Sequence, residues 1–109
     1  MKFRIEIEGD EAIVIFNGRY TIDTPRTALV TKIGTKVFGR GAGVIFDFLA
    51  LDEDCHESIP GLLLALWREA RMRRVAESKI RFRIRRNGRF AKLVQSCKLD
   101  RVIQVEWTD

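Results

Sequence analysis

The stretch Val44-Ile45-Phe46-Asp47-Phe48-Leu49-Ala50-Leu51 is nearly continuous in apolar residues and has the length of a β-strand. Runs of this kind, rich in Val, Ile and Phe, are typical of strands with little solvent contact. A polar loop follows over 52–57, and then the run Leu62-Leu63-Leu64-Ala65-Leu66-Trp67, whose composition favours a helix. We therefore predict a buried strand over 44–51, a loop, and a helix that begins at Ser58.

The residues around Ser58 carry the strongest local signals. Serine is a favoured N-cap, because its side-chain oxygen accepts a hydrogen bond from a first-turn N–H, and Pro60 is tolerated in a first turn. His56 is expected to be a surface loop residue, since no second base or nucleophile is evident to pair with it. The acids before the helix lack the spacing and the glycine of a calcium loop, so we expect them to be solvated and to favour the helix dipole: Asp52, Glu53, Asp54 and Glu57.

The rest of the chain alternates between strand and helix patterns. Phe3, Ile5 and Ile7 alternate with polar residues, as in a strand with one solvent-exposed face, and Gly9-Asp10 predicts a turn. The further predicted elements are a strand at Ala12–Phe16, a helix from Asp23-Thr24-Pro25 to about Phe38, the helix after Ser58, a strand at Ile80–Arg85, a short helix around Phe90–Cys97 and a strand at Val102–Trp107.

This order, β-β-α-β-α-β-α-β, predicts an α/β fold with a mixed, mostly parallel sheet. Strands separated by helices imply right-handed crossovers and parallel pairing, and the N-terminal hairpin adds an antiparallel edge. The helices are expected mainly on one face of the sheet, because a strand covered on both faces would not keep Arg81, Arg83 and Arg85 on one side. With 109 residues, the chain is expected to form a single domain over 1–109.

The net charge of +5 is unevenly distributed along the chain. Such asymmetry fits an acidic protein partner, a nucleic acid or a solvated basic face. Single-strand binding normally needs exposed aromatic residues, whereas Phe82 and Phe90 fall with the apolar set, so nucleic acid is the least favoured of the three. The basic residues crowd one quarter of the chain: Arg68, Arg71, Arg73, Arg74, Lys79, Arg81, Arg83, Arg85, Arg86, Arg89 and Lys92.

Several classes of function find no support in the sequence. No apolar run approaches the roughly 18 residues that span a bilayer, and the alternating N-terminus differs from a signal peptide, so we expect a cytoplasmic protein without membrane insertion. The segment Gly39-Arg40-Gly41-Ala42-Gly43 follows a helix and opens a strand, whereas phosphate-binding loops do the reverse. Cys55 and Cys97 lack metal-ligand spacing and are expected to be free thiols. We predict no metal, no cofactor and no enzymatic activity.

Four segments, taken in order, resemble the STAS domain, which occurs in bacterial anti-sigma factor antagonists and in sulfate transporters. Residues 13–19 (IVIFNGR) are similar to the family's second strand, which ends in a glycine. Residues 44–47 (VIFD) are similar to its central strand ending in Asp, and residues 97–103 (CKLDRVI) to its late Gly-Leu-x-x-Val-Phe segment. Residues 57–62 (ESIPGL) stand where the family usually carries Asp-Ser-Ser-Gly-Leu. The resemblance covers most of the chain.

The resemblance implies a protein-binding regulatory module. In the family, the serine of this motif is phosphorylated by the anti-sigma factor kinase that it binds, so Ser58 is the implied acceptor. The implied partner surface comprises Asp23, Thr24, Glu57, Ser58 and Ile59, and a helix N-terminus would hold the phosphate. Pro60 has no N–H, so such a phosphate would have one donor fewer. The alternatives are a STAS subunit of a lipid-transport complex and a basic nucleic-acid-binding module.

Overall fold

A five-stranded sheet runs through the molecule, with the strands in the same order in space as in sequence. The computed structural model describes residues 1–37 and 43–109. β1 pairs antiparallel with β2, and the remaining pairs are parallel, which confirms the predicted mixed sheet with an antiparallel edge. The strands are β1 (Lys2–Glu8), β2 (Glu11–Gly18), β3 (Gly43–Leu51), β4 (Ile80–Arg85) and β5 (Gln104–Thr108).

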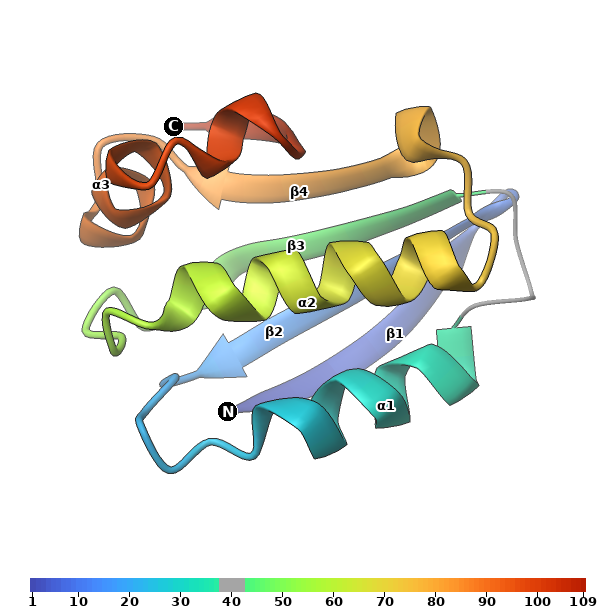
Figure 1. Cartoon of the computed structure of the whole chain (residues 1–109), viewed down its shortest axis with the longest axis horizontal. Helices are drawn as coiled ribbons and strands as arrows, with labels where there is room; N and C mark the ends of the chain where they lie inside the picture. The colour runs from blue at the N-terminus through green and yellow to red at the C-terminus, as the bar shows by residue number, and fades with distance from the viewer. Residues whose placement is uncertain (38–42) are drawn as a thin grey trace.

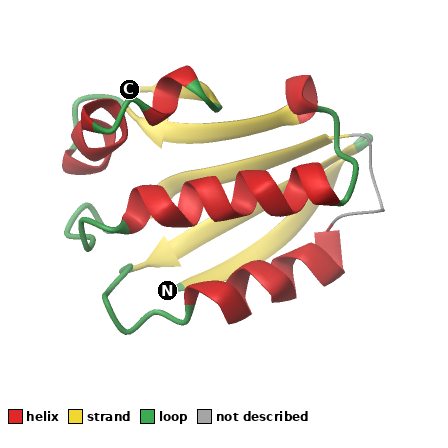
Figure 2. Cartoon of the chain, in the orientation of Figure 1, coloured by secondary structure: helices red, strands yellow, loops and turns green. Residues whose placement is uncertain are grey.

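The α-helices all cover one face of this sheet, as predicted (Figure 1, Figure 2). They are α1 (Arg26–Val37), α2 (Ile59–Met72) and α3 (Arg89–Ser96), and two 3₁₀ turns, η1 (Glu77–Lys79) and η2 (Leu99–Arg101), precede β4 and β5. In α2 the fully buried Leu62, Leu63 and Leu66 share one side of the helix, which turns them toward the sheet. No helix among the described residues has the length and apolar composition to cross a bilayer.

The core between sheet and helices is dominated by phenylalanine. Phe16 of β2 stacks on Phe48 of β3 with ring centroids 4.6 Å apart, and Phe46 lies 5.0 Å from Phe82 of β4. Phe90 of α3 lies 5.2 Å from Phe48 and extends the row to the helix layer. Aromatic side chains bury large areas, and these five rings therefore tie the three central strands to α3.

An irregularity near the end of β3 decides which residues enter this core. Ile15 pairs with Asp47, but Asn17 pairs with Ala50, so β3 carries one residue more than β2 over this stretch. The Asp47 carboxylate accepts a hydrogen bond from the Leu49 N–H at 2.9 Å, which holds the bulge. Strict alternation from Phe46 would turn Ala50 inward; instead Ala50 is exposed and Leu51 is buried.

Three predicted boundaries need correction or lie outside the described residues. β5 begins at Gln104 and not at Val102, because the Val102 N–H bonds to the Leu99 carbonyl in η2 and Val102 stays half exposed. α1 begins at Arg26, and the Pro25 carbonyl accepts its first hydrogen bond. The expected end of that helix near Phe38 and the glycine segment 39–42 lie outside the described residues.

The other face of the sheet carries a network of ion pairs in place of helices. Arg81 pairs with Glu11 of β2 and, at 2.7 Å, with Glu106 of β5. Arg83 pairs with Asp47 at 3.7 Å and with Glu106 at 3.5 Å. Arg81 and Arg83 are thus matched by acids on both sides, which removes much of the free positive charge that binding to nucleic acid phosphates requires.

The Arg81 side chain also shields apolar residues on this face. Arg81 is in register with Ile45, and reaching Glu11 on β2 takes its guanidinium across β3 at that position. Ile13 and Ile45 are only 3% and 2% exposed there, outside the helix-side core. Long arginine stems cover apolar surface in this way. The hydrogen bond to Glu11, above all, raises the pKa of Arg81, so the guanidinium stays charged.

Arg81 is therefore expected to contribute through both its charge and its stem. Arg81→Met, which keeps most of the stem, should lower the free energy of unfolding by about 1 kcal/mol, and Arg81→Ala by about 2 kcal/mol, because the alanine also uncovers Ile13 and Ile45. Urea unfolding followed by circular dichroism measures both. The control Arg68→Ala, at an exposed position of α2, should change stability by less than about 0.5 kcal/mol. Equal losses for the two Arg81 variants would contradict the shielding role.

Candidate functional site

Ser58 lies at the entrance of α2, as predicted. The helix starts at Ile59, and Ser58 is exposed immediately before it. The loop that carries it leaves the carboxyl end of β3, the middle strand of the sheet (Figure 1). The chain thus presents this hydroxyl to solvent at one end of the molecule, next to a buried strand.

The Ser58 hydroxyl does not cap the helix, which corrects the expected N-cap role. Ser58 has φ −80° and ψ 0° rather than the extended backbone of an N-cap, and its side chain makes no capping hydrogen bond. Its Oγ lies 2.7 Å from His56 Nδ1 instead. The Ser58 N–H also donates to Nδ1, at 3.1 Å. Nδ1 therefore carries the lone pair, the hydroxyl is the donor in the second bond, and the expectation that His56 has no partner was wrong.

The backbone donors at the start of α2 are engaged within the chain. The Ile59 N–H bonds to the His56 carbonyl at 3.1 Å, and the Gly61 N–H bonds to the Ser58 carbonyl at 2.9 Å. Pro60, between them, has no N–H. A helix N-terminus binds anions through free N–H groups. The first three residues of α2 offer none, so the expectation that the helix entrance itself would hold a phosphate on Ser58 finds no free donor there.

A cation from another helix lies beside this turn. The guanidinium of Arg26, the first residue of α1, lies against Gly61, so closely that a Cβ at position 61 would collide with it. Arg26, His56 and Ser58 line one shallow hollow of about 650 Å³. Nothing in the local sequence around Ser58 indicates Arg26, because it comes from an element 32 residues earlier in the chain.

Backbone hydrogen bonds join the two loops at this end of the molecule. The Asp52 N–H donates to the Gly18 carbonyl at 2.7 Å, and the His56 N–H donates to the Tyr20 carbonyl at 2.8 Å. The Arg19 guanidinium adds ion pairs to Asp52 at 3.7 Å and to Asp54 at 3.4 Å. The β2–α1 loop and the β3–α2 loop therefore form one surface.

The predicted partner residues divide into accessible and buried ones. Asp23, Glu57 and Ser58 are exposed, and Thr24 is half-buried and lines the same hollow as Ser58. The Thr24 Oγ1 accepts the Thr21 N–H at 2.9 Å, which fixes this turn. Ile59 is 0% exposed and belongs to the core, so its side chain is not available to a partner in this conformation.

Three of the four acids of the β3–α2 loop contact groups outside α2. Glu53 accepts the Phe90 N–H at 3.3 Å, and its carboxylate lies over Gly88, the residue before α3. Glu53 thus caps α3 from a distant loop, which corrects the expectation for this residue. Asp52, Asp54 and Glu57 are exposed as expected, and the first two pair with Arg19. Among the described residues, no group of His, Cys, Asp or Glu could hold a metal ion.

No protein-family model matches the chain, and no curated protein matches its sequence. Solved structures do match. An anti-sigma factor antagonist from Mycobacterium paratuberculosis superposes with a TM-score of 0.73 at 15% identity, covering 95% of this chain and 83% of that one. The anti-sigma factor antagonist SpoIIAA in its unphosphorylated form gives 0.66 at 19% identity over 99% and 89%. The phosphorylated form, from Bacillus, gives 0.57 at 16% over 99% and 92%.

The chain has the STAS fold. The α/β fold predicted from the order of the elements, and the STAS fold implied by the four segments, are therefore confirmed. At identities this low, the likeness is one of fold, and the roles of the residues around Ser58 have to be argued from this chain itself.

The two cysteines differ in burial, and one of them lies in the loop that leads to Ser58. Both are free; Cys55 is buried and Cys97 is exposed. Arg89 donates to the Cys55 carbonyl at 3.0 Å, so α3 holds the loop that leads to Ser58. Burial, chiefly, raises the pKa of the Cys55 thiol. A pKa above that of the unfolded chain means that the folded state holds its proton longer, and stability from this group is lost as the pH rises into the alkaline range.

We expect the exposed Cys97 to react with iodoacetamide in the folded protein. Cys55 should react only when the loop opens, because it is buried and its raised pKa disfavours the thiolate, which is the nucleophile. Peptide mass spectrometry after timed labelling at pH 8 separates the two sites. Arg89→Ala should speed Cys55 labelling at least fivefold by releasing the loop, whereas Arg86→Ala, whose ion pair lies with the exposed Asp109, should leave the rate unchanged. Similar native rates for both cysteines would contradict this arrangement.

Proposed function

We propose that this chain is a regulatory protein-binding module of the anti-sigma factor antagonist type. The observation that carries the proposal is the exposed hydroxyl of Ser58 at the entrance of α2, in a fold shared with anti-sigma factor antagonists. SpoIIAA, one of these neighbours, has been solved in both unphosphorylated and phosphorylated forms. The proposed partner is an anti-sigma factor with serine kinase activity, and the proposed location is the cytoplasm.

The proposed docking surface is the one formed by the two joined loops. Ser58 and Glu57 contribute from the β3–α2 loop, and Asp23 and Thr24 from the β2–α1 loop. The hydrogen bonds between these loops order the surface before a partner arrives. A preorganised surface loses less conformational entropy on binding than a mobile one does.

Phosphorylation of Ser58 would act on this surface through side chains. A phosphate adds about two negative charges next to Glu57, which is already acidic. It would also remove the hydroxyl hydrogen bond that His56 Nδ1 now accepts. Because the first-turn amides are engaged, Arg26 is the cation placed to receive the new charge. The modified surface would differ in both charge and local hydrogen bonding.

The Ser58–His56 pair is assigned a structural role and no catalytic one. A serine nucleophile of an acyl-transfer enzyme needs a base that is itself oriented by a third group, and an oxyanion site beside it. In the described part of the chain no side chain is hydrogen-bonded to His56 other than Ser58. The nearest first-turn amides are engaged in backbone bonds and do not form an oxyanion site.

The switch can be tested with variants at Ser58 and at a distant serine. Ser58→Asp should weaken binding of the anti-sigma factor encoded in the same genome at least tenfold by charge and desolvation, whereas Ser58→Ala should bind within threefold of the unmodified chain. Ser78→Asp is the matched control, since Ser78 is an exposed serine at the other end of α2, in η1. Isothermal titration calorimetry measures the three affinities. Equal binding by Ser58→Asp and Ser58→Ala would remove the switch from the proposal.

A further inference from the structure

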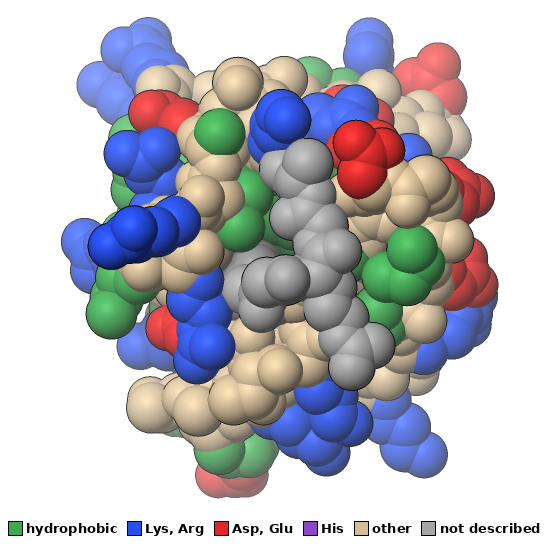
Figure 3. Space-filling model, turned by 90° about the vertical axis from the view of Figure 1, so that its right-hand side faces the viewer, with side chains coloured by type: hydrophobic (Ala, Val, Ile, Leu, Met, Phe, Trp, Pro, Cys, Tyr) green, Lys and Arg blue, Asp and Glu red, His purple; other side chains and the backbone are tan. Residues whose placement is uncertain are grey.

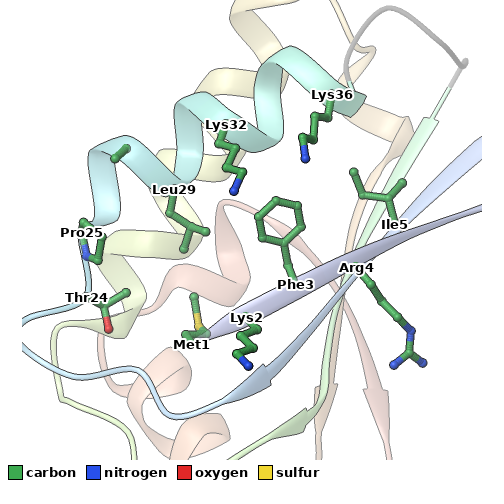
Figure 4. A pocket seen from close by; sticks show the side chains of 11 residues that line it. Met1, Lys2, Phe3, Arg4, Ile5, Thr24, Pro25, Leu29, Lys32 and Lys36 are labelled. Atoms are coloured by element: carbon green, nitrogen blue, oxygen red, sulfur yellow. The ribbon is translucent and has the colours of Figure 1, made fainter.

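A groove of about 650 Å³ lies between the edge strand β1 and helix α1, separate from the Ser58 hydroxyl (Figure 4). Its floor is apolar: Phe3 and Ile5 come from β1, and Leu29 comes from α1. These three side chains are only partly buried and pack against the main core. The groove volume falls in the range of about 300–1,000 Å³ that is typical of small-ligand sites.

The groove exists because the helices do not cover the edge of the sheet completely. β1 is an outer strand, and its helix-facing residues become more exposed along the strand, from half-buried Phe3 to Ile7 at 59% exposure. The Phe3 ring centroid lies 6.4 Å from that of Phe16, so the floor of the groove continues the aromatic core. Apolar surface that is continuous with a core and open to solvent often marks a binding site.

Two lysines of α1 stand over this apolar floor. The Nζ atoms of Lys32 and Lys36 lie 5.9 Å and 6.0 Å from the centroid of the Phe3 ring, and Figure 4 shows both side chains directed toward that ring. The residues are four apart, so they share one side of the helix. Neither ammonium forms an ion pair with a carboxylate in the described part of the chain, in contrast to Arg81 and Arg83 of β4.

The combination of an apolar floor and unpaired ammonium groups selects the ligand. A neutral apolar molecule would leave both charges without a counterion, and a small hydrophilic anion would leave the floor uncovered. We propose that this groove binds a long-chain carboxylate, with the carboxylate at Lys32 and Lys36 and the acyl chain along Phe3 and Leu29. Each buried methylene contributes about 0.8 kcal/mol, and the two ammonium groups add charge-assisted hydrogen bonds. Neither contribution depends on phosphorylation of Ser58.

The basic end of the molecule is a poorer candidate for the same ligand. Figure 3 shows Lys and Arg side chains gathered on the end of the molecule where α2 finishes. In the sequence, Arg71 lies in the last turn of α2, and Arg73 and Arg74 follow the helix. Arg73 pairs with Glu69 at 2.9 Å, and the Arg71 guanidinium lies over Trp67. Positive charge alone is therefore not sufficient, whereas the β1–α1 groove combines two ammonium groups with an apolar floor.

The proposal can be tested by titrating the purified chain with laurate below its micellar concentration. We expect saturable binding by calorimetry, with the largest NMR shift changes in β1, in α1 and in residues 24–25, which also line the groove. Dodecyltrimethylammonium, a cation of equal chain length, should bind at least tenfold more weakly. Failure of laurate to saturate the groove, or equal binding of the cation, would overturn the proposal. Binding of an acidic amphipathic peptide without binding of laurate would make the groove a peptide site and would overturn it as well.

Matched variants locate the site. Lys32→Gln/Lys36→Gln should weaken laurate binding at least tenfold, whereas Lys79→Gln/Lys92→Gln, at exposed positions elsewhere, should not change it. Ala28→Trp places a large side chain in the groove from an exposed position of α1 and should also abolish binding without disturbing the core. Circular dichroism and urea unfolding confirm that each variant is folded. Undiminished binding by folded Ala28→Trp and by the Lys32/Lys36 variant would place the ligand elsewhere and refute the assignment.

Discussion

The hydrogen bond from the Leu49 N–H to the Asp47 carboxylate is the constraint on which the functional end of the molecule depends. It holds an extra residue in β3, and that residue reverses the alternation of the strand. Leu51 rather than Ala50 then enters the core, and Asp52 starts the next loop in a position to bond the Gly18 carbonyl. Without the bulge, the loop to Ser58 would leave the opposite face of the strand.

The surface around Ser58 is built from side chains because its backbone groups are already engaged. Pro60 lacks an N–H, and the neighbouring amides donate to carbonyls of the same turn. The polar side chains beside this turn are those of His56, which bonds the Ser58 hydroxyl, and Arg26, which lies against Gly61. The chain thus keeps the STAS fold, while the local chemistry of its serine differs from that expected of a free helix entrance.

The sequence predicted the elements well and the local geometry poorly, for physical reasons. Alternation and helical spacing reflect burial, so the strand and helix order and the single helix-covered face could be predicted. The β3 bulge could not be predicted, because an Asp within an apolar run is equally compatible with a regular strand. The Ser58–His56 bond and the approach of Arg26 depend on how loops from different parts of the chain meet, and no local pattern encodes that.

The segment that leads into α1, together with its first turn, lies between the two hollows of the molecule. Thr24, Pro25 and Ala28 line both the β1–α1 groove and the hollow that contains Ser58 and His56. This short segment is a common wall, with one cavity on each side. Because the same three residues line both hollows, a shift of this segment that widens one hollow also changes the shape of the other.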